Sequence, residues 1–231
     1  FSEDPGQFAS QILIENNYIY NVGQGFIGTD TTELKGGINA VHDITLRNNV
    51  IRKTSGVGLN IGVDYFTLVN NSIIDTTDYG IEFSSRIIDG RVDLVHHALI
   101  SNNIVYGCNS NKIGWRGIYY PFSNQREGSQ IDYNMYYPNF SPWPSQPPEF
   151  DLHSNFGSDP KFLNYNSGDF HLTSESTAAI DAGVDLSSTG YSADKDGVPR
   201  PQGSAWDIGA YEYVNGSAVN PPNSVCGNNI T

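Results

Sequence analysis

Residues 66–74 read FTLVNNSII, and this arrangement of apolar residues around asparagine recurs along the chain. The related segments are ILIENNYIY at 12–20, ITLRNNVIR at 44–52, ALISNNIVY at 98–106 and QIDYNMYY at 130–137. Their aligned asparagines are Asn17, Asn49, Asn71, Asn103 and Asn134, which are 32, 22, 32 and 31 residues apart. A period of about twenty residues, with about ten more in some repeats, is typical of a stacked solenoid. The repeated unit is therefore one coil.

Apolar columns lie on both sides of the aligned asparagines. Three positions before them stand Ile14, Leu46, Leu68, Ile100 and Ile131, and two positions after them stand Ile19, Ile51, Ile73, Val105 and Tyr136. The intervening column is mostly polar and contains Glu15, Arg47, Val69, Ser101 and Asp132. Because side chains alternate across a strand, this pattern predicts a half-buried strand in each coil, with the intervening column facing water.

The asparagine column is expected to be structural. An asparagine side chain offers both a donor and an acceptor, and the residue tolerates left-handed backbone angles, which suits a tight turn. At the strand spacing of about 4.8 Å, successive amides can hydrogen-bond along the stack. We therefore predict a ladder through the five aligned asparagines. A less regular sixth rung is predicted at Asn155, where Leu152 to Asn155 fit the same frame.

Composition agrees with one elongated, turn-rich, all-β domain. The 231 residues include 24 glycines and 12 prolines, and no sustained helical periodicity is present. The net charge of −13 argues against nucleic acid and anionic membranes as partners, because both are bound through basic patches. No stretch is apolar enough to cross a bilayer, and residues 1–10 lack the features of a signal peptide.

The sequence changes character after Asn155. It contains SDPKF (158–162), GDFHLTSESTAAIDAG (168–183), DKDGVPRP (194–201) and AWDIGAYEY (205–213). In this order the motifs resemble the C-terminal module of secreted bacterial right-handed parallel β-helix repeat proteins of the choice-of-anchor type, with Ser176-Thr177-Ala178 in place of the usual Ser-Pro-Ala. The resemblance implies a right-handed parallel β-helix of about five to six coils at 1–155, a capping module at 156–213 and a flexible tail or linker at 214–231. It also implies a secreted or cell-surface protein, but no single activity.

Asp194 and Asp196, followed by Gly197, look like the start of a calcium loop. The next residues supply none of the further oxygen ligands that such a loop needs, so we expect a tight turn with no metal, and neither calcium nor another cofactor is supported. Arg200 and Asp207 are expected to satisfy one another or nearby backbone groups.

Disulfide formation by the cysteines and glycosylation of asparagines both depend on the source of the protein. The spacing of Cys108 and Cys226 is compatible with a disulfide and equally with two free thiols. Glycosylation sequons begin at Asn70, Asn139, Asn215 and Asn229, and they matter only where the source glycosylates its proteins.

The candidate binding face is a column of outward residues that follows a recurring glycine. The segments Gly58-Leu59-Asn60, Gly80-Ile81-Glu82 and Gly117-Ile118-Tyr119 place Asn60, Glu82 and Tyr119 in one column, and Asp64 and Arg86 each lie six residues beyond their glycine. Carboxylates, amides and an aromatic ring are groups that bind and stack on sugars. This stripe therefore predicts an extracellular glycan or polysaccharide as the partner.

Catalysis is the alternative use of this face, with Glu82 and Arg86 as the candidate residues. A lyase needs a base beside a uronate, and a hydrolase needs two carboxyl groups about 5 Å or about 6.5–9.5 Å apart, whereas the acids here are dispersed. The leading hypothesis is an extracellular module with a structural, adhesive or filament-forming role that can bind glycans. The alternatives are a polysaccharide lyase, ahead of a glycoside hydrolase, and a fragment lacking upstream coils. Because solenoid ends need covering, we expect upstream residues or end-to-end self-association to cover the first coil.

Overall fold

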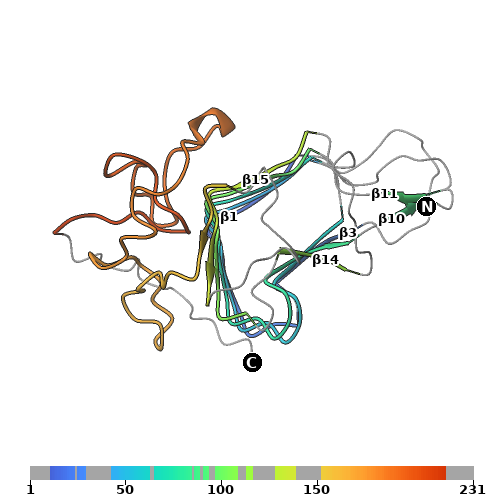
Figure 1. The fold of residues 1–231 in the computed structure, drawn as a ribbon, viewed down its shortest axis with the longest axis horizontal. Coiled ribbons are helices and arrows are strands. Elements are labelled where there is room, and N and C mark those ends of the chain that lie inside the picture. The colour runs from blue at the N-terminus through green and yellow to red at the C-terminus, as the bar shows by residue number, and fades with distance from the viewer. Residues whose placement is uncertain are drawn as a thin grey trace, which may run out of the picture.

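The computed structural model describes residues 11–23, 25–29, 43–62, 65–84, 86–88, 91–93, 97–108, 113–116, 128–138 and 152–216. These residues are all-β, as the sequence predicts, with no α-helix among them and one 3₁₀ turn at Ser187–Thr189. Most of the strands belong to three parallel sheets. Figure 1 looks along the stacking direction, so the strands of each sheet superimpose and the three sheets lie around a shared interior.

Each of the first four repeats adds one strand to each sheet, and among the described residues the fifth repeat adds strands to sheets I and II and the sixth to sheet II alone. Sheet I contains β1 (Ile12–Glu15), β4 (Ile44–Arg47), β7 (Phe66–Val69), β12 (Leu99–Ser101) and β15 (Gln130–Asp132). Sheet II contains β2 (Tyr18–Tyr20), β5 (Val50–Arg52), β8 (Ser72–Ile74), β13 (Ile104–Tyr106), β16 (Met135–Tyr137) and β17 (Asn155–Phe156). Sheet III contains β3 (Phe26–Thr29), β6 (Leu59–Gly62), β9 (Ile81–Ser84) and β14 (Ile113–Arg116). An antiparallel hairpin of β10 (Arg86–Ile88) and β11 (Arg91–Asp93) lies apart from them (Figure 1).

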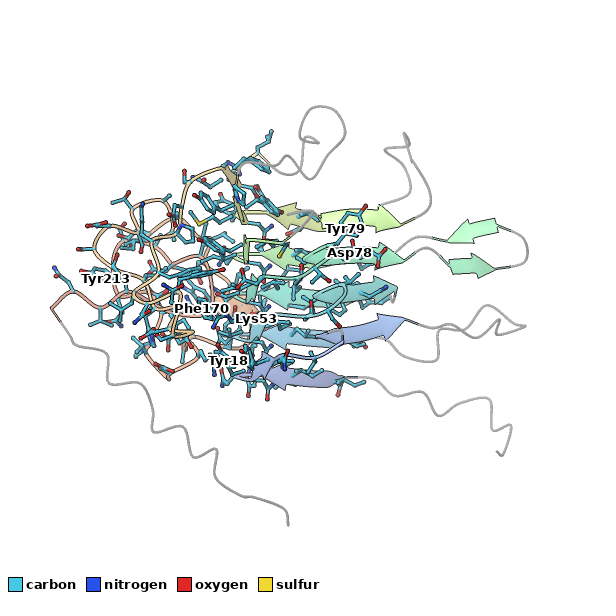
Figure 2. All side chains as sticks on the ribbon, turned by 90° about the horizontal axis from the view of Figure 1, so that it is seen from below. Tyr18, Lys53, Asp78, Tyr79, Phe170 and Tyr213 are labelled. Atoms are coloured by element: carbon cyan, nitrogen blue, oxygen red, sulfur yellow. The ribbon has the colours of Figure 1, made fainter. Side chains whose placement is uncertain are left out.

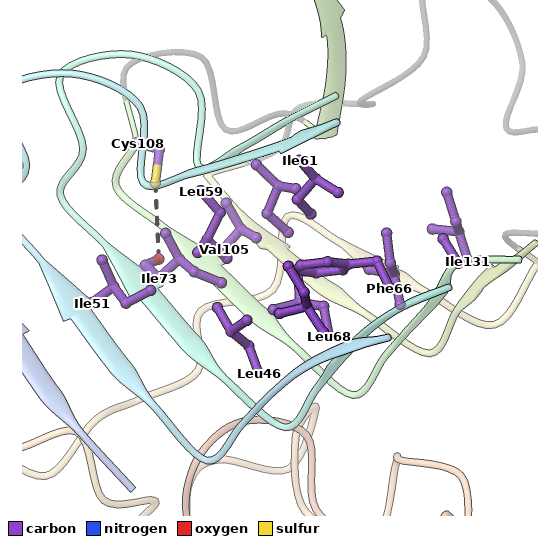
Figure 3. Packing of buried hydrophobic residues seen from close by; sticks show 14 of the residues in the cluster. Leu46, Ile51, Leu59, Ile61, Phe66, Leu68, Ile73, Val105, Cys108 and Ile131 are labelled. Carbon is purple, nitrogen blue, oxygen red and sulfur yellow. Dashed lines mark hydrogen bonds between the residues drawn. The ribbon is translucent and has the colours of Figure 1, made fainter. Parts of the chain in front are cut away.

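The interior is one apolar core that all three sheets share. The predicted columns supply much of it, since Leu46, Leu68 and Ile100 of sheet I pack with Ile51 and Ile73 of sheet II (Figure 3). Sheet III adds further fully buried side chains, namely Leu59, Ile61 and Ile81. The prediction that the apolar columns on either side of the asparagines face inward is confirmed. Burying such aliphatic side chains stabilises the stack by about 1.5–3 kcal/mol each.

The predicted asparagine ladder is present between sheets I and II. The side-chain Nδ2 of Asn71 donates to Oδ1 of Asn103 at 3.0 Å, and the backbone N–H of Asn71 donates to the same oxygen at 3.0 Å. The same pair of bonds joins Asn17 to Asn49, Asn49 to Asn71 and Asn103 to Asn134. From Asn49 onward the ladder residues are fully buried, so these bonds satisfy polar groups that water cannot reach.

The sixth rung exists, but its predicted frame is wrong by one residue. Asn155 pairs with Met135, one position past the ladder, and the backbone N–H of Asn134 donates to the Ser154 hydroxyl at 2.8 Å. Phe156 stacks on Tyr136 at 5.1 Å between ring centroids, which sets this register. A hydroxyl therefore takes the place of the asparagine amide in the last rung.

A second asparagine column lies beside the ladder and faces outward. Asn48, Asn70 and Asn102 directly precede ladder residues and have φ between 52° and 59°, the left-handed region that asparagine enters more readily than most residues. Their Nδ2 atoms donate to the carbonyls of Ala193 at 2.8 Å, Asp207 at 3.0 Å and Val184 at 2.8 Å, respectively. In the fifth repeat this position is Tyr133, whose ring stacks on His153 instead. We call Asn48, Asn70 and Asn102 the outer asparagines.

The C-terminal module, residues 156–213, packs along the side of the stack, where it contacts several repeats (Figure 2). The outer asparagines bind it, and Phe170 and Tyr211 pack against Val50 and Ile74 of sheet II. These contacts run across the repeats, so the module does not simply close the end of the stack, as capping would require. They also correct the expectation that the intervening column of sheet I faces water. Val69 is fully buried against Leu186, Tyr191 and Trp206, and Ser101 is buried as well.

Buried polar groups hold the module together. The Arg200 Nη1 atom donates to Glu212 Oε1 at 2.8 Å and to the Asp207 carbonyl at 3.1 Å, so the expected contact between Arg200 and Asp207 is made through the backbone. Asp194 Oδ1 accepts the backbone N–H groups of Asp196 and Val198, both at 2.8 Å. These bonds are those of the predicted tight turn.

Candidate functional site

The sequence-predicted stripe is represented in sheet III by Asn60 and Glu82. The two residues are register partners on β6 and β9, and Asn60 Nδ2 donates to Glu82 Oε2 at 3.0 Å. The prediction that they lie side by side is confirmed. The prediction that Glu82 is open to solvent is wrong, because only 1 % of it is exposed. Strand alternation sets which face of the sheet a side chain takes, but not what packs over that face.

The remaining stripe residues do not extend this pair. Ile113 pairs with Ile81, so Gly114 stands opposite Glu82 in the position that was predicted for Tyr119. Arg86 begins the hairpin strand β10 and pairs with Asp93 of β11, an element that the repeat pattern does not reveal. Tyr119 and Asp64 lie outside the described residues. The stripe thus provides, among the described side chains, one amide–carboxylate pair in which Glu82 is buried and Asn60 is half-buried.

A groove of about 600 Å³ opens on the outer face of sheet I, where the sequence analysis placed no site. Its floor is a column of register partners, Leu13, Thr45 and Thr67, on β1, β4 and β7. Thr45 and Thr67 are half-buried, and neither hydroxyl has a hydrogen-bond partner in the described part of the chain. The floor therefore offers two adjacent, unused hydroxyl groups.

An aromatic wall borders this groove on the side where the chain enters sheet I. Tyr65 directly precedes β7, and His97 stands at the equivalent position two residues before β12. Their rings stack with centroids 4.5 Å apart and planes 5° apart. Both residues have left-handed φ values, 54° and 55°, as does Asp43 in the repeat before. Tyr65 remains 51 % exposed. The wall thus presents aromatic surface to solvent next to the threonine floor.

The opposite wall is where the C-terminal module meets sheet I. Arg47 Nε donates to Glu15 Oε2 at 2.6 Å, and the Arg47 guanidinium lies 4.7 Å from the centre of the Tyr191 ring. Thr189 of the module completes this side, with its hydroxyl donating to the Leu186 carbonyl at 2.6 Å. Arg47 is thus held in place, and its charge is balanced within the chain.

The sequence carries a signal for this groove that repeat alignment could have found. Tyr65 and His97 occupy equivalent positions 32 residues apart, each before an apolar strand. Thr45 and Thr67 are likewise equivalent, one position before the inward Leu46 and Leu68. The part of the second wall that the module supplies carries no such signal, because Thr189 comes from a segment outside the repeats.

The structure describes one of the two cysteines and two of the four sequon asparagines. Cys108 is a buried free thiol in the core, where burial raises its pKa to about 11, and Cys226 lies outside the described residues. The Asn70 amide is buried and bound by the module, so this sequon is inaccessible in the folded chain. Asn215 lies in an exposed turn, and Asn139 and Asn229 fall outside the described residues.

No protein-family model, curated protein or solved structure matches this chain. Within the described ranges, no helix has the length and apolar character needed to cross a membrane. Nor do those ranges contain a group of three or more His, Cys, Asp or Glu side chains arranged to hold a metal ion.

Proposed function

We propose that this chain is a non-catalytic, right-handed parallel β-helix module of a secreted or cell-surface protein, with a structural and adhesive role. The observation that carries the proposal is the use of the paired asparagines. The inner residue of each pair bonds one repeat to the next, and in three of the four pairs the side chain of the outer residue bonds to the C-terminal module. The most regular polar residues of the chain therefore serve its architecture.

The resemblance of the module motifs to those of exported β-helix proteins supports the proposed location. Such a fold presents long side surfaces on a rigid stack, as solenoid proteins do when they bind extended partners. The parallel sheets and their shared apolar core are compatible with this fold.

Catalysis at the predicted face is disfavoured by the state of Glu82. A general base must reach the proton that it removes, whereas Glu82 is buried and already accepts a hydrogen bond from Asn60. Hydrolysis would also require a second carboxyl group at a defined distance, and the register position next to Glu82 is glycine, at Gly114.

Assays for turnover test the proposal directly. The purified chain is incubated with polyuronates and with neutral polysaccharides, while unsaturated products are followed by ultraviolet absorbance and new reducing ends by a colorimetric assay. We expect no turnover of either class. Turnover that disappears in both Glu82→Ala and Arg86→Ala, with unchanged melting temperatures, would establish the enzyme alternative.

A further inference from the structure

The middle of the groove floor, at Thr45 and Thr67, presents only side chains to a ligand, whereas β1 lies at the edge of sheet I among the described strands. The backbone of β4 pairs with β1 on one side and β7 on the other, and β7 also pairs with β12. A peptide that binds by strand addition needs a free sheet edge, and the middle of this face offers none. The occupant must therefore be recognised by hydroxyl and aromatic groups.

Those groups match a hydroxyl-rich ligand. The free hydroxyls of Thr45 and Thr67 can each donate and accept a hydrogen bond, as sugar hydroxyls also can. Tyr65 adds an exposed ring beside them, and His97 covers only one of its faces. A mostly apolar surface with a few polar groups that fix orientation is the usual composition of a small-ligand site, and here Ile12 and Leu13 supply the apolar part.

Charge decides between neutral and acidic ligands. Among the described lining residues the one arginine is Arg47, which is paired with Glu15 at 2.6 Å. The whole chain carries a net charge of −13. An acidic glycan would meet a negative field with no unpaired arginine among the described residues of the lining, whereas a neutral glycan would not be repelled.

The register sets the direction of binding. Thr45 and Thr67 are direct partners on neighbouring strands, so equivalent hydroxyls recur at the interstrand spacing of about 4.8 Å. A ligand that uses both must run across the strands, along the stacking direction. That orientation suits an extended chain with hydroxyl groups on each unit.

We propose that the groove formed by Leu13, Thr45, Thr67, Tyr65 and His97 binds a neutral, extended glycan chain laid along the stack. This inference rests on the proposed non-catalytic, adhesive function and assigns it a surface. It places the ligand on sheet I and not on the Asn60–Glu82 face of sheet III.

Titration calorimetry with defined hexasaccharides tests the site. The neutral probes are β-glucan, xylan and mannan hexasaccharides, and the acidic probe is hexagalacturonate. The groove variants are Tyr65→Ala and the double variant Thr45→Val/Thr67→Val, which removes the hydroxyls but keeps the β-branched shape. Tyr20→Ala is the matched control, because Tyr20 is 50 % exposed but lies on sheet II.

We expect at least one neutral probe to bind, with Kd rising about tenfold or more in each groove variant, which corresponds to about 1.4 kcal/mol. Tyr20→Ala should bind like the wild type. Binding that is unchanged in the double threonine variant, tighter binding of hexagalacturonate than of every neutral probe, or no binding of any probe would each overturn the proposal. If Tyr65→Ala fails to fold, binding by the double threonine variant alone decides whether the groove is the glycan site. Hydrolysis or elimination of a probe would instead contradict the non-catalytic function, so the two failures are distinguishable.

Discussion

Asn71 Nδ2 and Asn103 Oδ1 lie 3.0 Å apart inside the stack, and neither residue is accessible to solvent. Asn71 also donates to the carbonyls of Leu46 and Val69, both at 3.0 Å. One side chain therefore joins three successive repeats. Its loss would leave buried donors and acceptors without partners on both sides.

Substitution of Asn71 by alanine is expected to lower the free energy of unfolding by at least about 2 kcal/mol, because each buried polar group left unpaired costs about 1–3 kcal/mol. Asn17→Ala is the matched control, since Asn17 belongs to the same ladder but is exposed. We expect the control to lose about 1 kcal/mol or less. Urea unfolding of both variants measures the difference, and equal losses would argue against a ladder stabilised by burial.

Substitution of the outer Asn70 by alanine should loosen the C-terminal module. Asn70 donates to the carbonyls of Asp207 and Gly209 and accepts from the Tyr191 hydroxyl at 2.7 Å. Removing these bonds should cost about 1–3 kcal/mol. Hydrogen exchange in residues 205–212 should accelerate, as measured by mass spectrometry.

The control for Asn70→Ala is Asn16→Ala. Asn16 is also left-handed, with φ 59° against 52° at Asn70, so alanine meets similar backbone strain at both positions. Only the backbone carbonyl of Asn16 bonds to the module, through Lys195 Nζ at 2.8 Å. Similar exchange rates in the two variants would show that strain, and not lost module contacts, explains the effect.

Stability should fall as pH rises through the pKa of His171. Burial alone would lower this pKa, but hydrogen bonds to Asp196 and Asp169 raise it above its ordinary value. The folded state thus favours the protonated ring, so the stabilisation is complete below the unfolded pKa of about 6.5 and is lost as pH rises through the higher folded pKa. Urea unfolding from pH 5.5 to 9 should show this loss in the wild type and less of it in His171→Gln. A folded pKa below 6.5 by NMR titration would contradict the prediction.

Cys108 should resist alkylation in the folded chain. Its thiol is buried, and with a pKa of about 11 it stays protonated at pH 8, whereas the thiolate is the reactive form. Iodoacetamide labelling followed by peptide mass spectrometry should therefore be slow in buffer and fast in urea. Fast labelling in buffer, or a Cys108–Cys226 disulfide in unreduced peptides, would show that this description of the thiol is wrong.

The repeating part of the structure could be predicted because its determinants are local and recur. Leu46, Leu68 and Ile100 align through the asparagines, and strand alternation then sends them into the core. The recurrence of glycine before β6 and β9 also has a local cause. A Cβ at Gly58 would lie 2.5 Å from the Gly80 carbonyl oxygen, so a larger residue does not fit there. Such close backbone packing constrains each repeat in the same way.

Features that depend on non-repeating segments could not be predicted in this way. Val69 was expected to face water and is buried, because the module packs over it. Gly114 takes the place expected for Tyr119, because the strand that pairs with β9 begins at Ile113, which no glycine directly precedes, and not at the glycine-led segment Gly117-Ile118-Tyr119. The groove needs both kinds of segment, with a floor from the repeats and one wall from the module.

The outer asparagines mark, in the primary sequence, the repeats whose side-chain amides bond to the module. Asn-Asn pairs occur in the first four repeats, and in the fifth the outer residue is Tyr133, which turns to His153 and not to the module. The two residues before β5, β8 and β13 thus have separate roles, since the second bonds one repeat to the next and the first bonds the module. The fifth repeat, which carries only the inner asparagine, still contacts the module through Met135, which packs with Leu172, Ala179 and Ile208. The outer asparagine is therefore a position at which polar attachment of the module can be altered while the bonds between layers are kept.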